Sequence, residues 1–158
     1  MSDKKNYSKE ITTNRKAFHE YEILERFEVG IALVGTEVKS VRSQGASLQE
    51  AYISCEGSGL SLINASIPPY THGNIHNHEE KRKRPLLASR REISKIREAI
   101  TEKGMTCIPI KLYIKNSLIK LEIAIGRGKK LYDKREDIKA REDKREISRA
   151  LKSNLKNF

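Results

Sequence analysis

Three histidines close together in the chain are the residues best suited to catalysis or metal binding. His72, His76 and His78 lie within seven residues, and imidazoles at such short range can transfer protons or hold a metal ion. Their spacing matches no structural zinc pattern, and no cysteine lies near them. We interpret the segment as a polar loop whose histidine and asparagine donors face phosphate or solvent, and we predict no metal and no cofactor.

The other reactive side chains form none of the usual catalytic patterns. Cys55 and Cys107 stand alone, without CxxC spacing, and we interpret both as reduced and buried. No serine occupies a Gly-x-Ser-x-Gly motif, and 126–130 lacks the spacing of a phosphate-binding loop. The sequence therefore predicts that the protein is not an enzyme. Three isolated carboxylates are interpreted as solvent-exposed positions on strands or helices: Glu28, Glu37 and Glu122.

Positive charge is the dominant feature of the composition. The 158 residues include 32 Lys and Arg against 21 Asp and Glu, a formal net charge of +11. Such an excess indicates nucleic acid as the partner, with an acidic membrane surface or protein as the alternative. Several basic clusters spread along the chain favour a partner of large area such as structured RNA. The clusters are 14–16, 81–84, 90–91 and the segment from Arg127 onward.

We interpret the C-terminal segment, 127–158, as a basic tail that is not part of a core. It holds twelve Lys and Arg against six Asp and Glu, with few large apolar residues. Asp133 suits a helix N-cap with Glu136 three residues later. We predict a tail that is disordered alone and becomes helical on its partner. Tyr132 could stack on a base or pack on the body, and the residues leave both open.

The body, 14–126, shows alternating apolar residues typical of strands, interrupted by two helical patterns. Ser89 with Glu92 forms a capping-box pattern at the start of the second helix, which is expected to stop at Gly104. We predict a mainly β fold, a small antiparallel OB-like barrel with flanking helices, after a flexible N-terminus at 1–13. The strands are expected at 19–29, 51–55, 60–65, 106–114 and 118–125, and the first helix at 31–44.

No stretch of the sequence approaches the run of about 18 apolar residues that a membrane span requires. The first fifteen residues are polar and lack the apolar region of a signal peptide. We therefore predict a cytoplasmic protein without a membrane partner.

Eight short motifs, in order along the chain, closely resemble those of the SsrA-binding protein family, also called small protein B. The resemblance covers about 14–152, nearly the whole chain. The motifs are 14–21 (NRKAFHEY), 27–30 (FEVG), 35–40 (GTEVKS), 86–87 (LL), 91–93 (REI), 112–113 (LY), 127–130 (RGKK) and 133–135 (DKR).

This resemblance implies a six-stranded antiparallel barrel of OB type and an adaptor that catalyses nothing. It implies that the barrel binds the tRNA-like domain of transfer-messenger RNA, and that the pair enters stalled ribosomes for trans-translation. A monomer is expected. The residues that the resemblance assigns to RNA binding or its support are Asn14, Arg15, Lys16, His19, Glu28, Lys39, Leu87 and Lys120.

The resemblance also implies that the tail occupies the decoding centre and the empty mRNA channel, against small-subunit rRNA. Two departures from the family pattern stand out: Phe18 replaces a residue that is usually basic, and Tyr132 stands where some relatives have histidine. The tail residues assigned to the ribosome are Gly128, Lys129, Lys130, Tyr132, Asp133, Lys134 and Arg135.

Two other functions fit parts of the sequence. A structural ribosomal protein or general RNA chaperone would share the charge and the tail. A nuclease or RNA-modifying enzyme could use the loop that contains His72, His76 and His78.

Overall fold

The computed structural model describes residues 8–72, 77–129 and 141–149. The chain divides into two compact units, Met1–Gly128 and Lys129–Phe158. In the described ranges, no helix is both long and apolar enough to cross a membrane.

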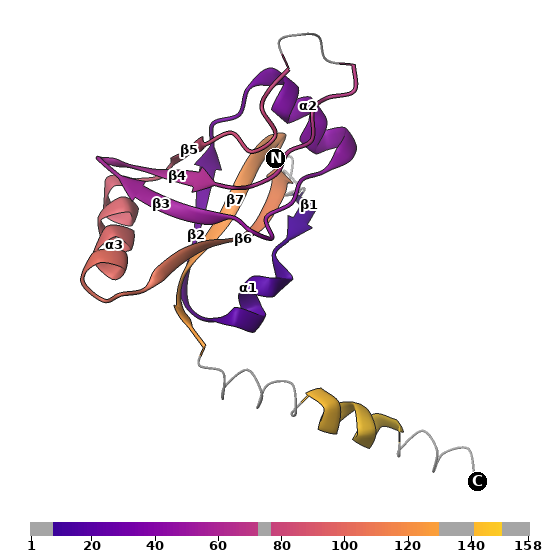
Figure 1. Cartoon of the computed structure of the whole chain (residues 1–158), viewed down its shortest axis with the longest axis vertical. Coiled ribbons are helices and arrows are strands. Elements are labelled where there is room, and N and C mark those ends of the chain that lie inside the picture. Colours follow the sequence, from indigo (N-terminus) through magenta and orange to yellow (C-terminus); the bar gives the residue numbers. More distant parts are fainter. Residues whose placement is uncertain (1–7, 73–76, 130–140, 150–158) are drawn as a thin grey trace, which may run out of the picture. The chain divides into compact units, whose positions relative to one another are not determined.

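The described strands of the first unit form one antiparallel sheet in the order β1-β6-β7-β2-β5-β4-β3 (Figure 1). The strands are β1 (Ser8–Thr13), β2 (Tyr21–Ile31), β3 (Tyr52–Glu56), β4 (Gly59–Ile63), β5 (Arg84–Leu87), β6 (Thr106–Lys115) and β7 (Leu118–Gly128).

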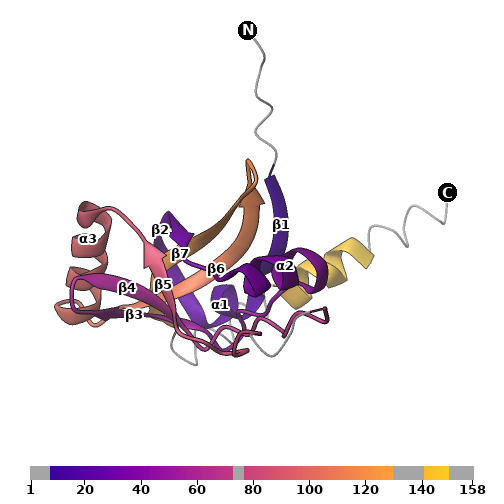
Figure 2. The same cartoon turned by 90° about the horizontal axis from the view of Figure 1, so that it is seen from above.

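The sheet curls round on itself, as Figures 1 and 2 show. Its hydrogen-bonded edges are β1 and β3, so the ladder is open, yet β3 comes round to lie against β6. The predicted mainly β, barrel-like fold with flanking helices is confirmed. The described residues contain seven strands where the resemblance implied six.

Three helices flank the sheet: α1 (Arg15–Glu20), α2 (Gly35–Gln44) and α3 (Arg90–Thr101). The Ser89 hydroxyl accepts from the Glu92 N–H, and the Glu92 carboxylate accepts from the Ser89 N–H, so the predicted capping box is confirmed. The helical part of α3 ends at Thr101, and the chain then turns to Gly104, where φ is +61°. Gly45 ends α2 with a φ of +86°, which glycine adopts without strain.

The apolar core lies inside the curl, between the sheet and α3. Val29, Leu121 and Ile123 point inward from adjacent strands, and Ile96 from α3 is fully buried among them. Burying each such side chain stabilises the fold by roughly 1.5–3 kcal/mol. This cluster fixes the two faces of the central strands: residues that alternate with it must point outward.

Among the described residues of the first unit, a helix covers one end of the outer face of the sheet. There α1 packs Ala17 on Ile108, Ile110 and Ala124, which form a second small cluster with Phe18, Tyr21 and Ile23 beside it. The other end of the outer face carries no such apolar cluster among the described residues. The open end is therefore the part of the sheet available to a partner.

The N-terminal segment corrects two expectations. Residues 1–13 were predicted to be flexible, but Ser8–Thr13 pairs with β6 as an edge strand. An edge strand needs backbone hydrogen bonds on one side only and can keep polar side chains, so its composition did not reveal it. The strand expected at 19–29 starts at Tyr21, because residues 15–20 form α1.

Two tight turns join neighbouring strands of the sheet. Lys115 of β6 pairs with Leu118 of β7, so Asn116 and Ser117 are the turn residues. Both have positive φ, +50° and +68°, as a two-residue type I′ turn requires. The strands expected at 51–55 and 60–65 correspond to β3 and β4, which pair across a turn at Gly57, where φ is +58°.

Candidate nucleic-acid interface

Four residues form a row across four adjacent strands at the open end of the outer face. Leu87 of β5 pairs with Gly30 of β2, Gly30 pairs with Lys120 of β7, and Lys120 pairs with Tyr113 of β6. Their inward-pointing neighbours Val29, Leu86, Leu112 and Leu121 are all buried in the core. The register thus places a buried tyrosine, a lysine, a glycine and an exposed leucine next to one another in that order. We call this set the sheet row.

Gly30 leaves the space in which Leu87 lies. A Cβ atom built at Gly30 would come within 3.1 Å of the Leu87 Cβ, closer than side chains normally approach. Leu87 is nonetheless 65% exposed, so it rests on the bare backbone of β2 and presents its apolar surface outward. An exposed leucine beside a lysine can contact a sugar or base while the lysine contacts a phosphate.

A second row of charged residues runs beside the sheet row. Glu28 pairs in register with Glu122, and Glu122 pairs with Lys111. The two adjacent carboxylates are each met by a cation: an Arg26 nitrogen lies 3.3 Å from Glu122, and the Lys115 ammonium lies 3.5 Å from Glu28.

Tyr113 joins the two rows. Its hydroxyl donates to the Glu28 carboxylate across β7, and the Lys111 ammonium lies 5.2 Å from the centre of its ring. The hydrogen bond from Tyr113 is the main reason that the pKa of Glu28 lies below its ordinary value, with Lys115 and Lys120 contributing through their positive charge. Burial and the same hydrogen bond raise the pKa of Tyr113. At neutral pH Glu28 is therefore a fixed acceptor that orients the tyrosine.

The predicted residues on and before α1 lie away from the sheet row. Asn14 is 6% exposed, and its side-chain amide donates to the Pro109 carbonyl at 3.0 Å while its backbone N–H donates to Ile110 at 2.7 Å. It anchors α1 to β6 and presents no free surface to a partner. The Lys16 ammonium lies 3.1 Å from Glu50 and 3.9 Å from Glu20.

Arg15 is exposed on α1 and His19 is half-buried. Phe18, the departure from the family pattern, lies under the Arg26 guanidinium, 5.3 Å from its ring centre. Lys39 is exposed on α2, with its ammonium 5.8 Å from the ring centre of Tyr70. Of the eight predicted RNA-binding residues, the fold thus brings together Glu28, Leu87 and Lys120.

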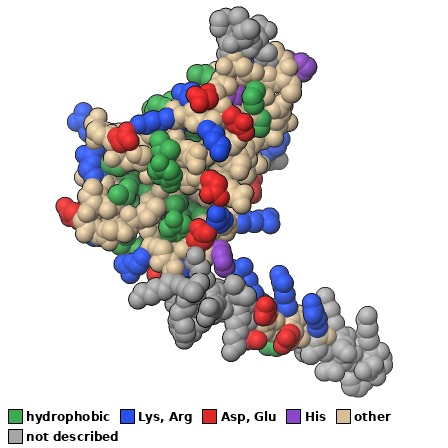
Figure 3. Space-filling view, viewed as in Figure 1, with side chains coloured by type: hydrophobic (Ala, Val, Ile, Leu, Met, Phe, Trp, Pro, Cys, Tyr) green, Lys and Arg blue, Asp and Glu red, His purple; other side chains and the backbone are tan. Residues whose placement is uncertain are grey.

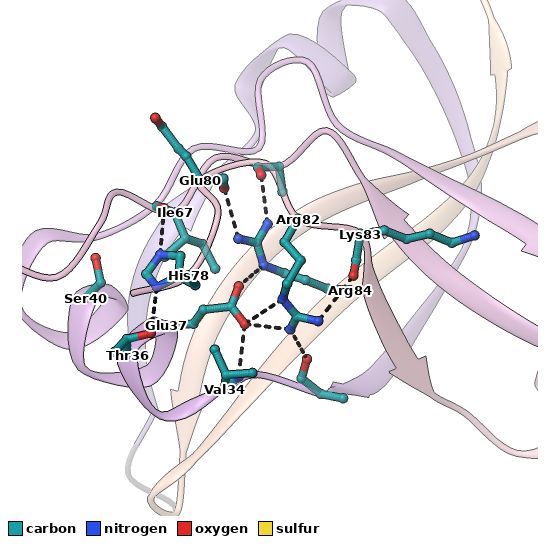
Figure 4. A network of polar contacts seen from close by, with 12 residues as sticks. Val34, Thr36, Glu37, Ser40, Ile67, His78, Glu80, Arg82, Lys83 and Arg84 are labelled. Carbon is teal, nitrogen blue, oxygen red and sulfur yellow. Dashed lines mark hydrogen bonds and ion pairs between the residues drawn. The ribbon is translucent and has the colours of Figure 1, made fainter. Parts of the chain in front are cut away.

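The basic segment 81–84 is exposed only in part: Lys81 and Lys83 are exposed, whereas Arg82 is half-buried and Arg84 is buried. Arg84 and Glu37 are both fully buried and form an ion pair (Figure 4). Arg82 also contacts Glu37, at 2.6 Å, and the Val34 N–H donates to the same carboxylate at 2.9 Å. The interpretation of Glu37 as a solvent-exposed carboxylate was wrong, because pairing with two arginines more than forty residues away allows it to be buried.

Burial alone would raise the pKa of Glu37, but the hydrogen bonds from Arg82, Val34 and Arg84 outweigh it and hold the pKa below its ordinary value. The Arg84 guanidinium also donates to the carbonyls of Ala65 at 2.8 Å and Glu80 at 2.9 Å. This network therefore fixes the segment before β5 to α2. It positions β5, and with it Leu87.

His78 belongs to the same region and has a structural role. It is 9% exposed, with its two ring nitrogens 2.9 Å from the Thr36 hydroxyl and 3.0 Å from the Ile67 carbonyl. The expectation that this histidine faces phosphate or solvent was wrong. His72 packs edge-on against Tyr70, and His76 lies outside the described residues. Within the described ranges, no group of three or more His, Cys, Asp or Glu is placed to hold a metal ion.

The two cysteines differ from each other. Cys107 is 1% exposed, and burial raises the pKa of its thiol to about 12, so it is protonated at neutral pH. Cys55 is only half-buried, in contrast to the interpretation of both as buried. Both are free thiols, as predicted.

In the second unit, residues 141–149 form a helix whose charges are segregated. Its positively charged residues recur at three- and four-residue intervals, which places them on one side of a helix, together with Ser148. They are Arg141, Lys144, Arg145 and Arg149, and they line one shallow groove. The other predicted tail residues, Lys130, Tyr132, Asp133, Lys134 and Arg135, lie outside the described residues, while Gly128 ends β7 and Lys129 follows it.

Sequence reasoning missed Arg26, Lys111 and Lys115 as members of the charged surface. Strand alternation could have assigned them to the outer face, but only the register between β2, β6 and β7 shows that they surround Glu28.

Comparison with known proteins places this chain in one family. The sequence model described as SmpB protein matches residues 11–153. The SsrA-binding protein of Protochlamydia amoebophila is 54% identical over 143 residues, which are 90% of this chain and 94% of that protein. The SsrA-binding protein of Pelotomaculum thermopropionicum is 51% identical over 148 residues, 94% of this chain and 97% of that protein.

A solved structure described as "tmRNA-SmpB: a journey to the center of the bacterial ribosome" contains a similar chain. The two share 38% sequence identity with a TM-score of 0.65, over 78% of this chain and 87% of that one. Sequence and fold therefore lead to the same assignment. The chain belongs to the SmpB protein family.

Proposed function

We propose that this protein is an RNA-binding adaptor that binds the tRNA-like domain of transfer-messenger RNA and acts with it on stalled ribosomes in trans-translation. The observation that carries the proposal is the family match over residues 11–153, shared with a solved chain named for tmRNA and the bacterial ribosome. The net charge of +11 suits a large phosphate-rich partner. The adaptor is a cytoplasmic monomer that performs no catalysis of its own.

The sheet row and the charged row beside it are the RNA-binding surface in this proposal. Lys120 contacts a phosphate, Leu87 contacts a sugar or base, and Glu28, held by the hydroxyl of the buried Tyr113, offers carboxylate oxygens in a fixed orientation. In this proposal Asn14 acts indirectly, because it holds α1 on β6. The burial of Asn14 and its hydrogen bond to the Pro109 carbonyl are the observations in favour of this role. Arg15, Lys16 and Lys39 add positive charge around the barrel, and His19 adds a side chain that can form hydrogen bonds.

The tail acts separately from the barrel in this proposal. Residues 127–158 enter the decoding centre and the empty mRNA channel, and residues 128–135 meet small-subunit rRNA there. The helix at 141–149 supports this role, because one basic side suits a channel wall of phosphates.

RNA recovered with the protein tests the proposal. The protein is purified from its own cells, and the bound RNA is sequenced. We expect a single dominant tRNA-like RNA. We also expect far less than one copy of the protein per ribosome. A stoichiometric ribosomal component, or a mixture of unrelated RNAs, would contradict the proposal.

The variant Lys120→Ala tests the sheet row within this function. Loss of one phosphate contact should weaken binding to the tRNA-like domain and reduce the slope of log K against log salt by about one unit. Lys103→Ala, which removes an exposed lysine after α3, is the matched control and should leave the slope unchanged. Equal effects of the two variants would remove Lys120 from the interface.

A further inference from the structure

Helix α3 carries a second polar surface that the sheet row does not include. Arg90, Ser94, Arg97 and Thr101 are spaced at four, three and four residues, so they lie along one side of the helix. All four are exposed. The opposite side of α3 holds Ile96 and Ala99 against the core, which fixes the direction in which the arginines point.

The tip of the β3–β4 hairpin completes this surface. Ser58 lies with Arg90, Ile93, Ser94 and Arg97 around a groove of about 400 Å³. The Arg97 guanidinium donates to the Gly57 carbonyl, so this arginine is held at the hairpin turn. Two guanidinium groups and two hydroxyls thus converge on one groove, and all are hydrogen-bond donors that suit phosphate oxygens.

The arginines of this groove keep their charge available. Among the described residues, neither Arg90 nor Arg97 forms an ion pair with a carboxylate. The nearby carboxylate Glu56 is paired with Lys83. Glu92 is engaged by the capping box at Ser89.

Glu98 follows Arg97 in the chain and is exposed. It lies beside the side of α3 that carries Arg90, Ser94, Arg97 and Thr101. Lys95, in contrast, lies on another side of the helix and pairs with Glu25 at 2.6 Å. The groove therefore gathers two of the exposed arginines of α3, and Figure 3 shows Lys and Arg side chains at the edge of the molecule where Figure 1 places α3.

The groove lies near one end of the sheet row. Leu87 precedes Arg90 by three residues, and its neighbour Leu86 pairs with Leu60 just after the hairpin turn. A nucleic-acid backbone that leaves the sheet row at Leu87 would meet Arg90 next. This continuity favours RNA as the occupant over a short acidic peptide, because RNA presents phosphates at regular intervals along an extended surface.

We propose that Arg90, Arg97, Ser58 and Ser94 form a phosphate-binding groove, which extends the RNA-binding surface from the sheet row onto α3 and the β3–β4 hairpin. The inference rests on the proposed function, since it assigns a further contact to the same RNA. The groove takes one or two phosphates of the RNA backbone and reads no base.

The double variant Arg90→Ala/Arg97→Ala tests the groove. Its affinity for the isolated tRNA-like domain is measured between 50 and 200 mM salt, beside the wild type. Loss of two phosphate contacts should reduce the slope of log K against log salt by roughly 1.4 to 1.8. The ratio of the wild-type affinity to the variant affinity should therefore fall about tenfold between 50 and 200 mM salt. The matched control is Lys95→Ala/Lys103→Ala, which removes the same amount of positive charge outside the groove. Lys95 lies on another side of α3 and Lys103 follows the helix, so this variant should keep the wild-type slope.

A third variant separates a binding role from a structural one. Arg90→Lys/Arg97→Lys keeps both charges and should recover most of the slope, while far-ultraviolet circular dichroism and the thermal midpoint show that all variants fold. If the alanine and control variants change the slope equally, the groove is not an RNA contact. If the wild type itself does not bind the tRNA-like domain, the proposed function fails instead, so the two failures are distinguishable.

Discussion

At the scale of single residues, the sheet row depends on a glycine as much as on its charged members. Gly30→Ala would put a Cβ atom 3.1 Å from the Leu87 Cβ and push that side chain outward. We expect weaker binding to the tRNA-like domain with little change in the salt slope, because the contact that shifts is apolar. Gly35→Ala is the control, since nothing lies within 4 Å of its added Cβ atom. A fully normal affinity for Gly30→Ala would show that the position of Leu87 does not matter to the RNA.

The hydrogen bond between Tyr113 and Glu28 gives a second prediction at this scale. Tyr113→Phe removes the donor, so the pKa of Glu28 should rise toward its ordinary value, as measured by nuclear magnetic resonance titration of the carboxyl carbon. A lowered pKa in the folded state adds stability above the unfolded pKa, near 4.3, and this contribution is lost as the pH falls through the folded value. The variant should therefore be less stable than the wild type at neutral pH, and the difference should shrink in acid. An unchanged Glu28 titration would contradict the geometry.

At the scale of elements, the buried ion pair of Arg84 and Glu37 fixes β5 to α2. Glu37→Ala would leave the Arg84 guanidinium buried without its counter-charge, at a cost of about 3–5 kcal/mol in the free energy of unfolding. That is a large part of the stability of a typical domain. Urea denaturation measures it, with Glu56→Ala as the control: Glu56 pairs with Lys83 at the exposed surface, where solvent screens the pair, so its loss should change the free energy of unfolding far less. Similar costs for the two variants would mean that the buried pair does not support the fold.

The same network predicts how this contact depends on pH. Because the pKa of Glu37 is held below its ordinary value, its contribution is present at neutral pH and is lost only as the pH falls through that lowered value. Burial lowers the pKa of Arg84, yet its guanidinium stays protonated at neutral pH, since arginine titrates far above it. The attachment of β5 to α2 should therefore hold across the neutral range and weaken only in acid.

At the scale of the whole molecule, the two units predict separate losses of function. Removing residues 129–158 leaves every strand of the barrel and its core in place. RNA affinity should stay within a few-fold of the full chain, while peptide tagging on stalled ribosomes is lost. The swap Arg145→Glu with Glu146→Arg keeps the net charge but places a carboxylate on the basic side of the tail helix, and it should also reduce tagging without weakening RNA binding. Equal loss of RNA binding and tagging on truncation would show that the tail contributes only general attraction.

The sequence by itself determined most of the secondary structure of the body, the net charge and the family. Alternating apolar residues are enough to specify five of the strands, and the pair Ser89 and Glu92 is enough to start α3, because both signals are local. The strands β1 and β5 and the short helix α1 were not predicted, since none of them carries a strong apolar pattern of its own.

Only the tertiary structure decided which charged residues face outward. In the sequence, Arg84 looks like part of an exposed basic run and Glu37 like an isolated surface carboxylate, yet both are fully buried as partners. Conversely, Leu87, Gly30, Lys120 and Tyr113 become neighbours only through strand register. The reason is physical: alternation along one strand fixes which face a side chain takes, whereas its neighbours and counter-charges come from segments far away in the chain, brought close by the packing of the sheet.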